Sequence, residues 1–284
     1  MISNVVLAGV AGWPVAHSLS PLLHNYWLRE CGISGAYVPL AIRGEDFSTA
    51  VDGLRRAGFA GLNVTLPHKI AAAALAQELD AMAQATGAAN LLVFRTGGAI
   101  LGRNTDVEGL AASLVEELGA ETVQDNPIVI LGAGGAARAS ILAVASLGAR
   151  EIHVLVRDLR KAEGALGPLR AHIATPLHLH RWPEWPDVAR NVSLVINATS
   201  AGMAGATELD LTLKPLPKDV AICDLIYNPL ETDLIKRARA RGNRAMNGLG
   251  MLMHQAVPAF AAFFGLEPKV TPALRDELER ALRS

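Results

Sequence analysis

The sequence predicts an α/β protein of two domains, one of them built on a doubly wound parallel sheet. Short apolar runs rich in β-branched residues alternate with helical patterns along most of the 284 residues, as in βαβ units. A chain of this length favours about two domains. In addition, the apolar run 128–131 leads into a glycine cluster at 132–135, and a helical pattern then continues to Leu147.

This strand–turn–helix order is typical of a dinucleotide-binding site. Gly132 would allow the tight turn, and Gly134 would let the backbone approach a pyrophosphate at the helix N-terminus. The predicted strand 151–156 completes a βαβ unit of about 30 residues. The alternative is a purely structural glycine turn. We assign the turn to cofactor binding in a Rossmann-type domain through Gly132, Ala133, Gly134, Gly135 and Ala136.

Basic residues follow the second strand of this unit. An NAD site usually has an acidic residue there for the ribose 2′-hydroxyl, but the strand runs into Arg157, and Lys161 follows closely. A guanidinium forms paired hydrogen bonds with phosphate, which favours NADP. Asp158 beside Arg157 keeps NAD possible.

Composition and charge exclude several classes of protein. A formal net charge of −1 argues against nucleic-acid and membrane-surface partners, and no apolar run reaches the ~18 residues of a membrane span. Cys31 and Cys223 have no CxxC spacing, so we expect buried, reduced thiols in a cytoplasmic protein. No His/Cys/Asp cluster has the spacing of metal ligands, so we expect no metal.

The N-terminal third begins with an apolar strand at 5–10 and a helix that starts at Ser20-Pro21. Ser20 would be the N-cap of this helix and Pro21 its first residue. Alternatively, the hydroxyls of Ser18 and Ser20 would bind a carboxylate at the helix N-terminus. An edge strand at 36–40, a helix at 46–57 and a strand from Gly61 follow.

The strand from Gly61 leads to Lys69, in the first turn of the next helix. A cation there opposes the helix macrodipole, although a lone lysine is most often a surface residue. The pattern predicts a helix over 71–85, a hairpin of strands 88–94 and 100–103, and a helix over 107–118. Asp106 would be its N-cap or a functional carboxylate.

In the C-terminal half, Trp182 to Pro186 reads as a loop. Buried strands at 192–197 and 221–226 each end in polar residues, which should lie near the cofactor because ligands bind at the carboxyl ends of parallel strands. A helix at 232–241, a short strand at 244–246 and helices from 248 and over 272–283 complete the prediction.

Eight motifs in order resemble the shikimate dehydrogenase (shikimate/quinate dehydrogenase) family from about residue 5 to 265. They are Gly12-x-Pro14-x-x-His17-Ser18-x-Ser20-Pro21-x-x-His24-Asn25, Asn63-Val64-Thr65-x-Pro67-x-Lys69, Gly87-Ala88-x-Asn90, Asn104-Thr105-Asp106, Gly132-x-Gly134-Gly135-Ala136, Asn197-x-Thr199-x-x-Gly202-Met203, Asp224-x-x-Tyr227-x-Pro229-x-x-Thr232 and Gly250-Met251-Leu252-x-x-Gln255.

The resemblance implies a substrate-binding domain of residues 1–107 plus 246–284 and an NADP-binding domain of residues 108–245, with the active site in the cleft. It implies Lys69 and Asp106 as the catalytic pair. The implied substrate-binding residues are Ser18, Ser20, Asn63, Thr65, Asn90, Tyr227 and Gln255. Beyond the glycine turn, the cofactor side would comprise Arg157, Lys161, Thr199, Met203 and Gly248.

The implied reaction interconverts 3-dehydroshikimate and shikimate with NADP(H), by a monomer or homodimer. Hydride transfer from a secondary alcohol requires loss of the hydroxyl proton, which a lysine held by a carboxylate can accept. Leu91 stands where the family usually has Thr. This departure leaves a paralogue acting on quinate, aminoshikimate or a related hydroxy acid as the alternative, possibly with NAD. A catalytically idle nucleotide-binding protein is a third hypothesis, which the retained catalytic pair argues against.

Overall fold

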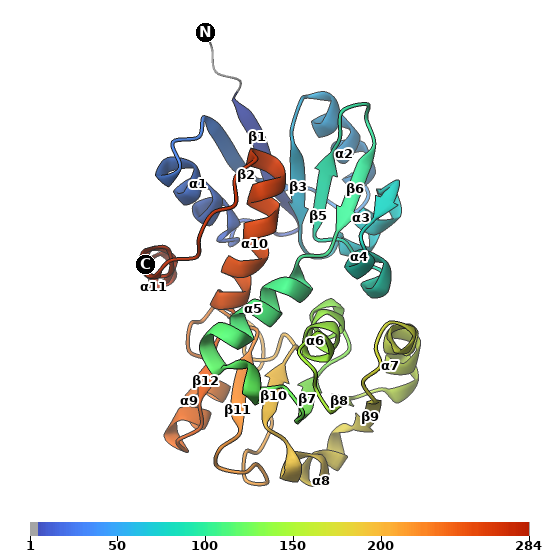
Figure 1. Ribbon diagram of the computed structural model, residues 1–284, viewed down its shortest axis with the longest axis vertical. Helices are drawn as coiled ribbons and strands as arrows, with labels where there is room; N and C mark the ends of the chain where they lie inside the picture. Colours follow the sequence, from blue (N-terminus) through green and yellow to red (C-terminus); the bar gives the residue numbers. More distant parts are fainter. Residues whose placement is uncertain (1–4, 284) are drawn as a thin grey trace. The chain divides into compact units, whose positions relative to one another are not determined.

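The computed structural model describes residues 5–283, which divide into two compact units (Figure 1). The first unit comprises the described chain up to Asp106 and the segment from Met253 onward, and the second is Val107–Leu252. The first boundary falls next to the predicted position, after residue 107. The second falls later than residue 246, inside a helix. Within the described residues, no helix combines the length and apolar character that a membrane span requires.

The first unit is built on a mixed sheet with the strand order β2-β1-β3-β5-β6-β4. Its strands are β1 (Val6–Gly12), β2 (Gly35–Ala41), β3 (Gly61–Val64), β4 (Glu78–Leu79), β5 (Leu91–Phe94) and β6 (Ile100–Arg103). β1 pairs in parallel with β2 and β3, whereas β5 is antiparallel to β3 and β6. Pro39 lies on the edge strand β2 as predicted, where a missing N–H leaves no gap in the ladder.

The helices of the first unit are α1 (Ser20–Glu30), α2 (Phe47–Arg56), α3 (Lys69–Leu75), α4 (Ala81–Thr86), α10 (Leu249–Phe264) and α11 (Pro272–Arg283). They pack on this sheet or, as α11 does on α1, on one another. On one face, α2 and α3 pack Phe47 and Ala72 against Leu62 and Leu92. A second apolar cluster, containing Ala259 of α10, consists of Ala8, Val10, Val15, Tyr37, Leu91, Ala259 and Phe263.

The predicted helix over 71–85 is wrong, because the chain leaves helical geometry at Ala76. Gln77 bonds to Ile100 through both backbone and side chain, which holds β4 beside β6. Asp80 then begins a new helix, α4, by accepting a hydrogen bond from Ala83 N–H. The alanine-rich composition suits a helix throughout, but pairing with a distant strand interrupts it. The predicted end at Gly87 is confirmed, since Gly87 has φ 62°.

The second unit contains a parallel sheet with the order β12-β11-β10-β7-β8-β9. Its strands are β7 (Pro127–Leu131), β8 (Glu151–Val156), β9 (Leu177–Arg181), β10 (Leu194–Asn197), β11 (Ala221–Asp224) and β12 (Ala245–Met246). Its helices are α5 (Asp106–Leu118, whose first residue belongs to the first unit), α6 (Gly135–Ser146), α7 (Leu159–Leu166), α8 (Trp185–Val188) and α9 (Asp233–Ala240).

This strand order is that of the doubly wound dinucleotide-binding fold, which confirms the predicted fold class. The topological switch point lies between β7 and β10, where ligands bind beyond the strand ends. Sequence patterns did not predict α7 or β9. The segment 182–186 is helical rather than a loop, since Trp185 is buried and anchors α8 in the core. Of the two thiols, Cys223 is buried as expected and Cys31 is half-exposed.

Candidate functional site

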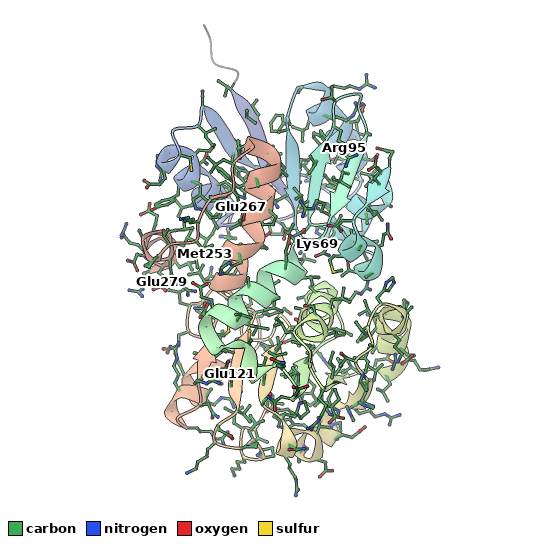
Figure 2. All side chains as sticks on the ribbon, in the orientation of Figure 1. Lys69, Arg95, Glu121, Met253, Glu267 and Glu279 are labelled. Atoms are coloured by element: carbon green, nitrogen blue, oxygen red, sulfur yellow. The ribbon has the colours of Figure 1, made fainter. Side chains whose placement is uncertain are left out.

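Lys69 and Asp106 form an ion pair in the first unit, although 37 residues separate them. Lys69, the first residue of α3 (Figure 2), places Nζ 2.6 Å from Asp106 Oδ2. The side chains are 25% and 10% exposed, so the pair is reachable from solvent mainly through the lysine. Asp106 is not the predicted N-cap, because it is the first residue of α5 and its carboxylate binds other side chains. Asn104 Oδ1 instead accepts the Asp106 N–H.

Asn90 holds the other oxygen of this carboxylate. Its Nδ2 lies 2.8 Å from Asp106 Oδ1, 3.0 Å from Thr105 Oγ1 and 3.3 Å from Gln255 Oε1. Asn90 Oδ1 accepts a hydrogen bond from the Thr105 N–H at 2.8 Å. The Thr105 hydroxyl donates to Gln255 O at 2.9 Å. The structure therefore joins Lys69, Asp106, Asn90, Thr105 and Gln255 in one network, in which Asn90 contacts Asp106, Thr105 and Gln255.

The remaining predicted substrate residues lie elsewhere in the first unit or, for Tyr227, in the second unit. Asn63 is buried at the end of β3, and its Nδ2 lies 3.3 Å from Asn90 O. Thr65, half-buried, follows β3 directly. Ser18 is also half-buried, and its Oγ accepts the Ser20 N–H at 3.3 Å. Ser20 is not the N-cap, since Leu19 holds that position and Ser20 is the first residue of α1. Tyr227 lies in the second unit, where burial raises the pKa of its phenol.

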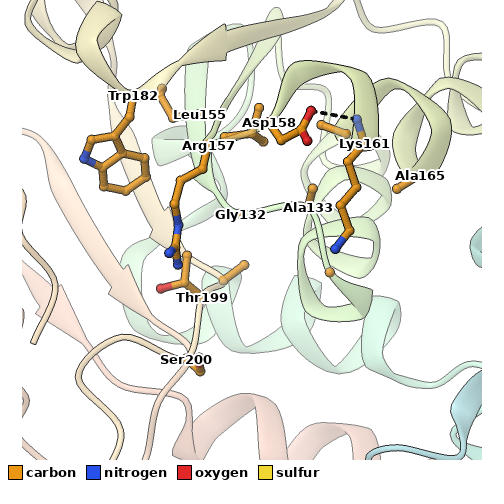
Figure 3. Close-up of a pocket in the computed structure, with 14 residues that line it drawn as sticks. Gly132, Ala133, Leu155, Arg157, Asp158, Lys161, Ala165, Trp182, Thr199 and Ser200 are labelled. Atoms are coloured by element: carbon orange, nitrogen blue, oxygen red, sulfur yellow. Dashed lines mark hydrogen bonds between the residues drawn. The ribbon is translucent and has the colours of Figure 1, made fainter. Parts of the chain in front are cut away.

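A pocket of about 760 Å³ opens at the switch point of the second unit (Figure 3). It is lined by Gly132, Ala133, Gly134, Leu155, Val156, Arg157, Asp158, Lys161, Ala162, Ala165, Trp182, Ala198, Thr199 and Ser200. Gly132 has φ 106°, and a Cβ there would lie 3.1 Å from Thr199 Cγ2. Side chains at Gly134 would meet nothing within 4 Å. The turn is therefore open to a bound group, as a pyrophosphate site requires.

Two cations reach this pocket. Arg157 is exposed, and Figure 3 shows its side chain running toward Thr199. Lys161 lines the pocket from the first turn of α7. Asp158, the residue that kept NAD possible, is the N-cap of α7, and its Oδ1 accepts the Lys161 N–H at 3.1 Å. A local structural role therefore accounts for this acid, and the donor set fits a phosphorylated ribose.

A buried network shapes the pocket wall after β10. Asn197 Oδ1 accepts from the Thr199 hydroxyl at 2.7 Å and from the Thr199 N–H at 3.1 Å. Asn197 Nδ2 donates to Asp224 Oδ1 at 2.9 Å. Burial raises the pKa of Asp224, which also accepts from the Thr232 hydroxyl. This network fixes the orientation of Thr199, a predicted cofactor residue.

The pocket differs in part from the predicted cofactor set. Gly135, Ala136, Met203 and Gly248 are outside its lining. Gly248 has a packing role, since a Cβ there would lie 2.1 Å from Leu225 O. Sequence reasoning missed Trp182 and Ser200, which line the pocket, and did not select Thr105. The sequence did offer a signal for two of them, because Ser200 directly follows Thr199 and Thr105 directly precedes Asp106.

Leu91, the departure from the family pattern, is fully buried on β5. It belongs to the apolar cluster that also contains Val10, Tyr37 and Ala259. The Leu91 side chain is therefore part of the core of the first unit and does not present an extra apolar surface to a ligand.

The chain is similar to known proteins over almost its whole length. The family model described as the shikimate dehydrogenase substrate binding domain matches residues 10–92. A shikimate dehydrogenase (NADP(+)) from Paramagnetospirillum magneticum is 45% identical over 275 residues, which cover 97% of this chain and 98% of the relative. A crystal structure of a shikimate dehydrogenase in complex with NADP+ has a TM-score of 0.86 at 34% identity, covering 100% of this chain and 96% of that one.

A quinate dehydrogenase from Corynebacterium glutamicum in complex with NAD is also similar, with a TM-score of 0.89 at 30% identity and 99% coverage of both chains. The relative from Paramagnetospirillum magneticum shares nearly half of its residues with this chain across almost the whole length of both. The fold, the ordered motifs and this identity lead to one conclusion: the chain belongs to the shikimate dehydrogenase family.

Proposed function

We propose that this protein interconverts 3-dehydroshikimate and shikimate by NADP-dependent hydride transfer, with Lys69 and Asp106 as the catalytic pair. The observation that carries the proposal is the 2.6 Å contact between Lys69 Nζ and Asp106 Oδ2 in a polar network. A partly exposed amine held by a largely buried carboxylate is suited to move a proton to and from a substrate oxygen. The names of the similar proteins support the choice of substrate and cofactor.

In the direction of oxidation, the neutral amine of Lys69 accepts the proton of the substrate hydroxyl. Gly132–Gly134, Arg157 and Lys161 would hold NADP, whose nicotinamide would supply the hydride acceptor for the carbinol carbon. In the direction of reduction, the Lys69 ammonium returns the proton to the oxygen. Asp106 keeps the amine in place and stabilises its charged form, while Asn90 Nδ2 fixes the carboxylate.

Substrate recognition would come from polar residues of the first unit. Asn63, Asn90 and Gln255 present amide groups suited to hydroxyls. Ser18 and Ser20, at the start of α1, present hydroxyls and helix N–H groups suited to a carboxylate. We also propose Thr65 and Tyr227 as substrate contacts, on the match of their motifs to the family.

Cofactor binding would use the pocket of the second unit. The turn at Gly132–Gly134 would hold the pyrophosphate, and Arg157 and Lys161 would bind the 2′-phosphate that distinguishes NADP from NAD. A cytoplasmic location and a monomeric or homodimeric state are part of the same proposal. The free thiols of Cys31 and Cys223 are typical of a reducing compartment.

The test is steady-state oxidation of shikimate and of quinate by the purified protein, each with NADP and with NAD. We expect the highest kcat/KM for shikimate with NADP. Lys69→Ala should lower it about 10²- to 10⁴-fold, the usual contribution of a general base, whereas Lys218→Ala, at an exposed lysine, should not change it. Higher kcat/KM for quinate or with NAD would favour the paralogue, and full activity of Lys69→Ala would exclude the catalytic assignment.

A further inference from the structure

Tyr37 is a fully buried tyrosine whose hydroxyl reaches a candidate substrate residue. It lies on β2, is 1% exposed, and donates a hydrogen bond to Asn63 Oδ1 at 2.8 Å. Burial raises the pKa of this phenol well above its usual range, so the hydroxyl keeps its proton. The contact joins residues 26 positions apart in the sequence.

The ring of Tyr37 is held rigidly. The His24 imidazole stacks on it with ring centroids 4.0 Å apart and planes within 1°. Asn25 bonds both backbone groups of Tyr37, accepting its N–H at 3.1 Å and donating to its carbonyl at 2.8 Å. Leu91 belongs to the same apolar cluster as Tyr37. The position of the hydroxyl is therefore set by the fold.

The Asn90 carbonyl selects one orientation of the Asn63 amide, and the Tyr37 hydroxyl then holds the amide oxygen in that orientation. Asn63 Nδ2 lies 3.3 Å from the carbonyl oxygen of Asn90, which can only accept a hydrogen bond. Rotating the amide would place two oxygens against each other there. The Tyr37 hydroxyl supplies the matching donor to Oδ1. With Oδ1 occupied, the second Nδ2 hydrogen has no partner within the part of the chain that the structure describes.

We propose that Tyr37 is a positioning residue, which orients the Asn63 amide so that it presents an N–H donor to a substrate hydroxyl. This inference rests on the proposed function, in which Asn63 contacts substrate. Asn90, whose backbone receives one Asn63 N–H, also holds Asp106 through its side chain. Because the Tyr37 hydroxyl bonds to Asn63, which is proposed to contact substrate and not to move the proton, its loss should weaken substrate binding rather than proton transfer.

The test is a double-mutant cycle between Tyr37→Phe and Asn63→Ala. Tyr37→Phe keeps the ring and its stacking but removes the donor. We expect KM for shikimate to rise roughly five- to tenfold, the effect of one neutral hydrogen bond, with kcat, its pH profile and KM for NADP unchanged. In the Asn63→Ala background the same substitution should have no effect on KM. Tyr26→Phe, at a half-buried tyrosine of α1, is the matched control and should leave KM unchanged.

In an active enzyme, an unchanged KM in Tyr37→Phe would overturn the inference, and so would the same rise in KM with and without Asn63. A fall in kcat at unchanged KM would also contradict it, since this would indicate a role in the chemical step. Failure of the proposed function is a separate outcome, because the wild-type protein would then not oxidise shikimate. Thermal unfolding of each variant separates lost binding from lost folding.

Discussion

His24 should make the first unit less stable in mild acid. The imidazole is 0% exposed and surrounded by the rings of Trp27, Tyr37, Phe260 and Phe263. Neither ring nitrogen has a hydrogen-bond partner in the described structure. Burial without a partner disfavours the charged form and lowers the pKa of His24 from 6.5 to about 3.

The sign and size of the effect follow from proton linkage. Between the two pKa values, the unfolded chain binds a proton at His24 that the folded chain does not, so stability is lost as pH falls below 6.5. At pH 5, protonation of His24 stabilises the unfolded state by RT ln(1 + 10^1.5), about 2 kcal/mol. At pH 8 this stabilisation is close to zero. His24→Leu removes the titrating group. The free energy of unfolding of His24→Leu minus that of wild type should therefore be about 2 kcal/mol larger at pH 5 than at pH 8.

The assay is urea denaturation at both pH values, read by pulsed hydrogen exchange of peptides from β1 and α1, which report the unit that contains His24. Packing changes caused by His24→Leu cancel, because they are the same at both pH values. His172→Leu, at an exposed histidine, is the control and should show no pH-dependent difference. An equal stability difference between His24→Leu and wild type at pH 5 and pH 8 would refute the reasoning.

Three further predictions concern the Lys69–Asp106 pair, the pocket of the second unit and Gly248. Asp106→Asn should lower kcat/KM for shikimate at least about 100-fold without changing the dissociation constant of NADP in a fluorescence titration; a loss below tenfold would contradict the assigned role. Arg157→Ala should raise KM for NADP roughly 10- to 100-fold, the cost of charged hydrogen bonds, and leave KM for NAD unchanged. The matched variant Arg160→Ala, outside the pocket lining, should change neither. Gly248→Ala should lower the melting temperature because its Cβ would lie 2.1 Å from a backbone oxygen. Gly164→Ala, in α7, would place a Cβ with nothing within 4 Å and should raise the melting temperature by restricting the unfolded chain. Calorimetric scans that show the opposite signs would exclude this account.

The sequence by itself determined the first strand–turn–helix unit of the nucleotide-binding half of the fold. The strand before Gly132, the glycine turn and the helix after it are local signals, and each was found where predicted. Thr232 at the start of α9 is a further case, since its side chain accepts the Ile235 N–H. Such signals succeed because backbone sterics and hydrogen bonds within a few residues decide the geometry. The order of motifs was likewise sufficient to indicate the family.

Tertiary structure alone decided the partners of the candidate catalytic groups. Asp106 was equally compatible with an N-cap, and only the tertiary structure of the first unit placed its carboxylate against Lys69. The alanine-rich stretch from Ala71 was broken by pairing of β4 with β6, which local propensity does not contain. The surroundings of His24 and the direction of Leu91 likewise depend on which helices pack against the sheet. In each case the deciding contact comes from a residue far along the chain, and folding alone brings it near.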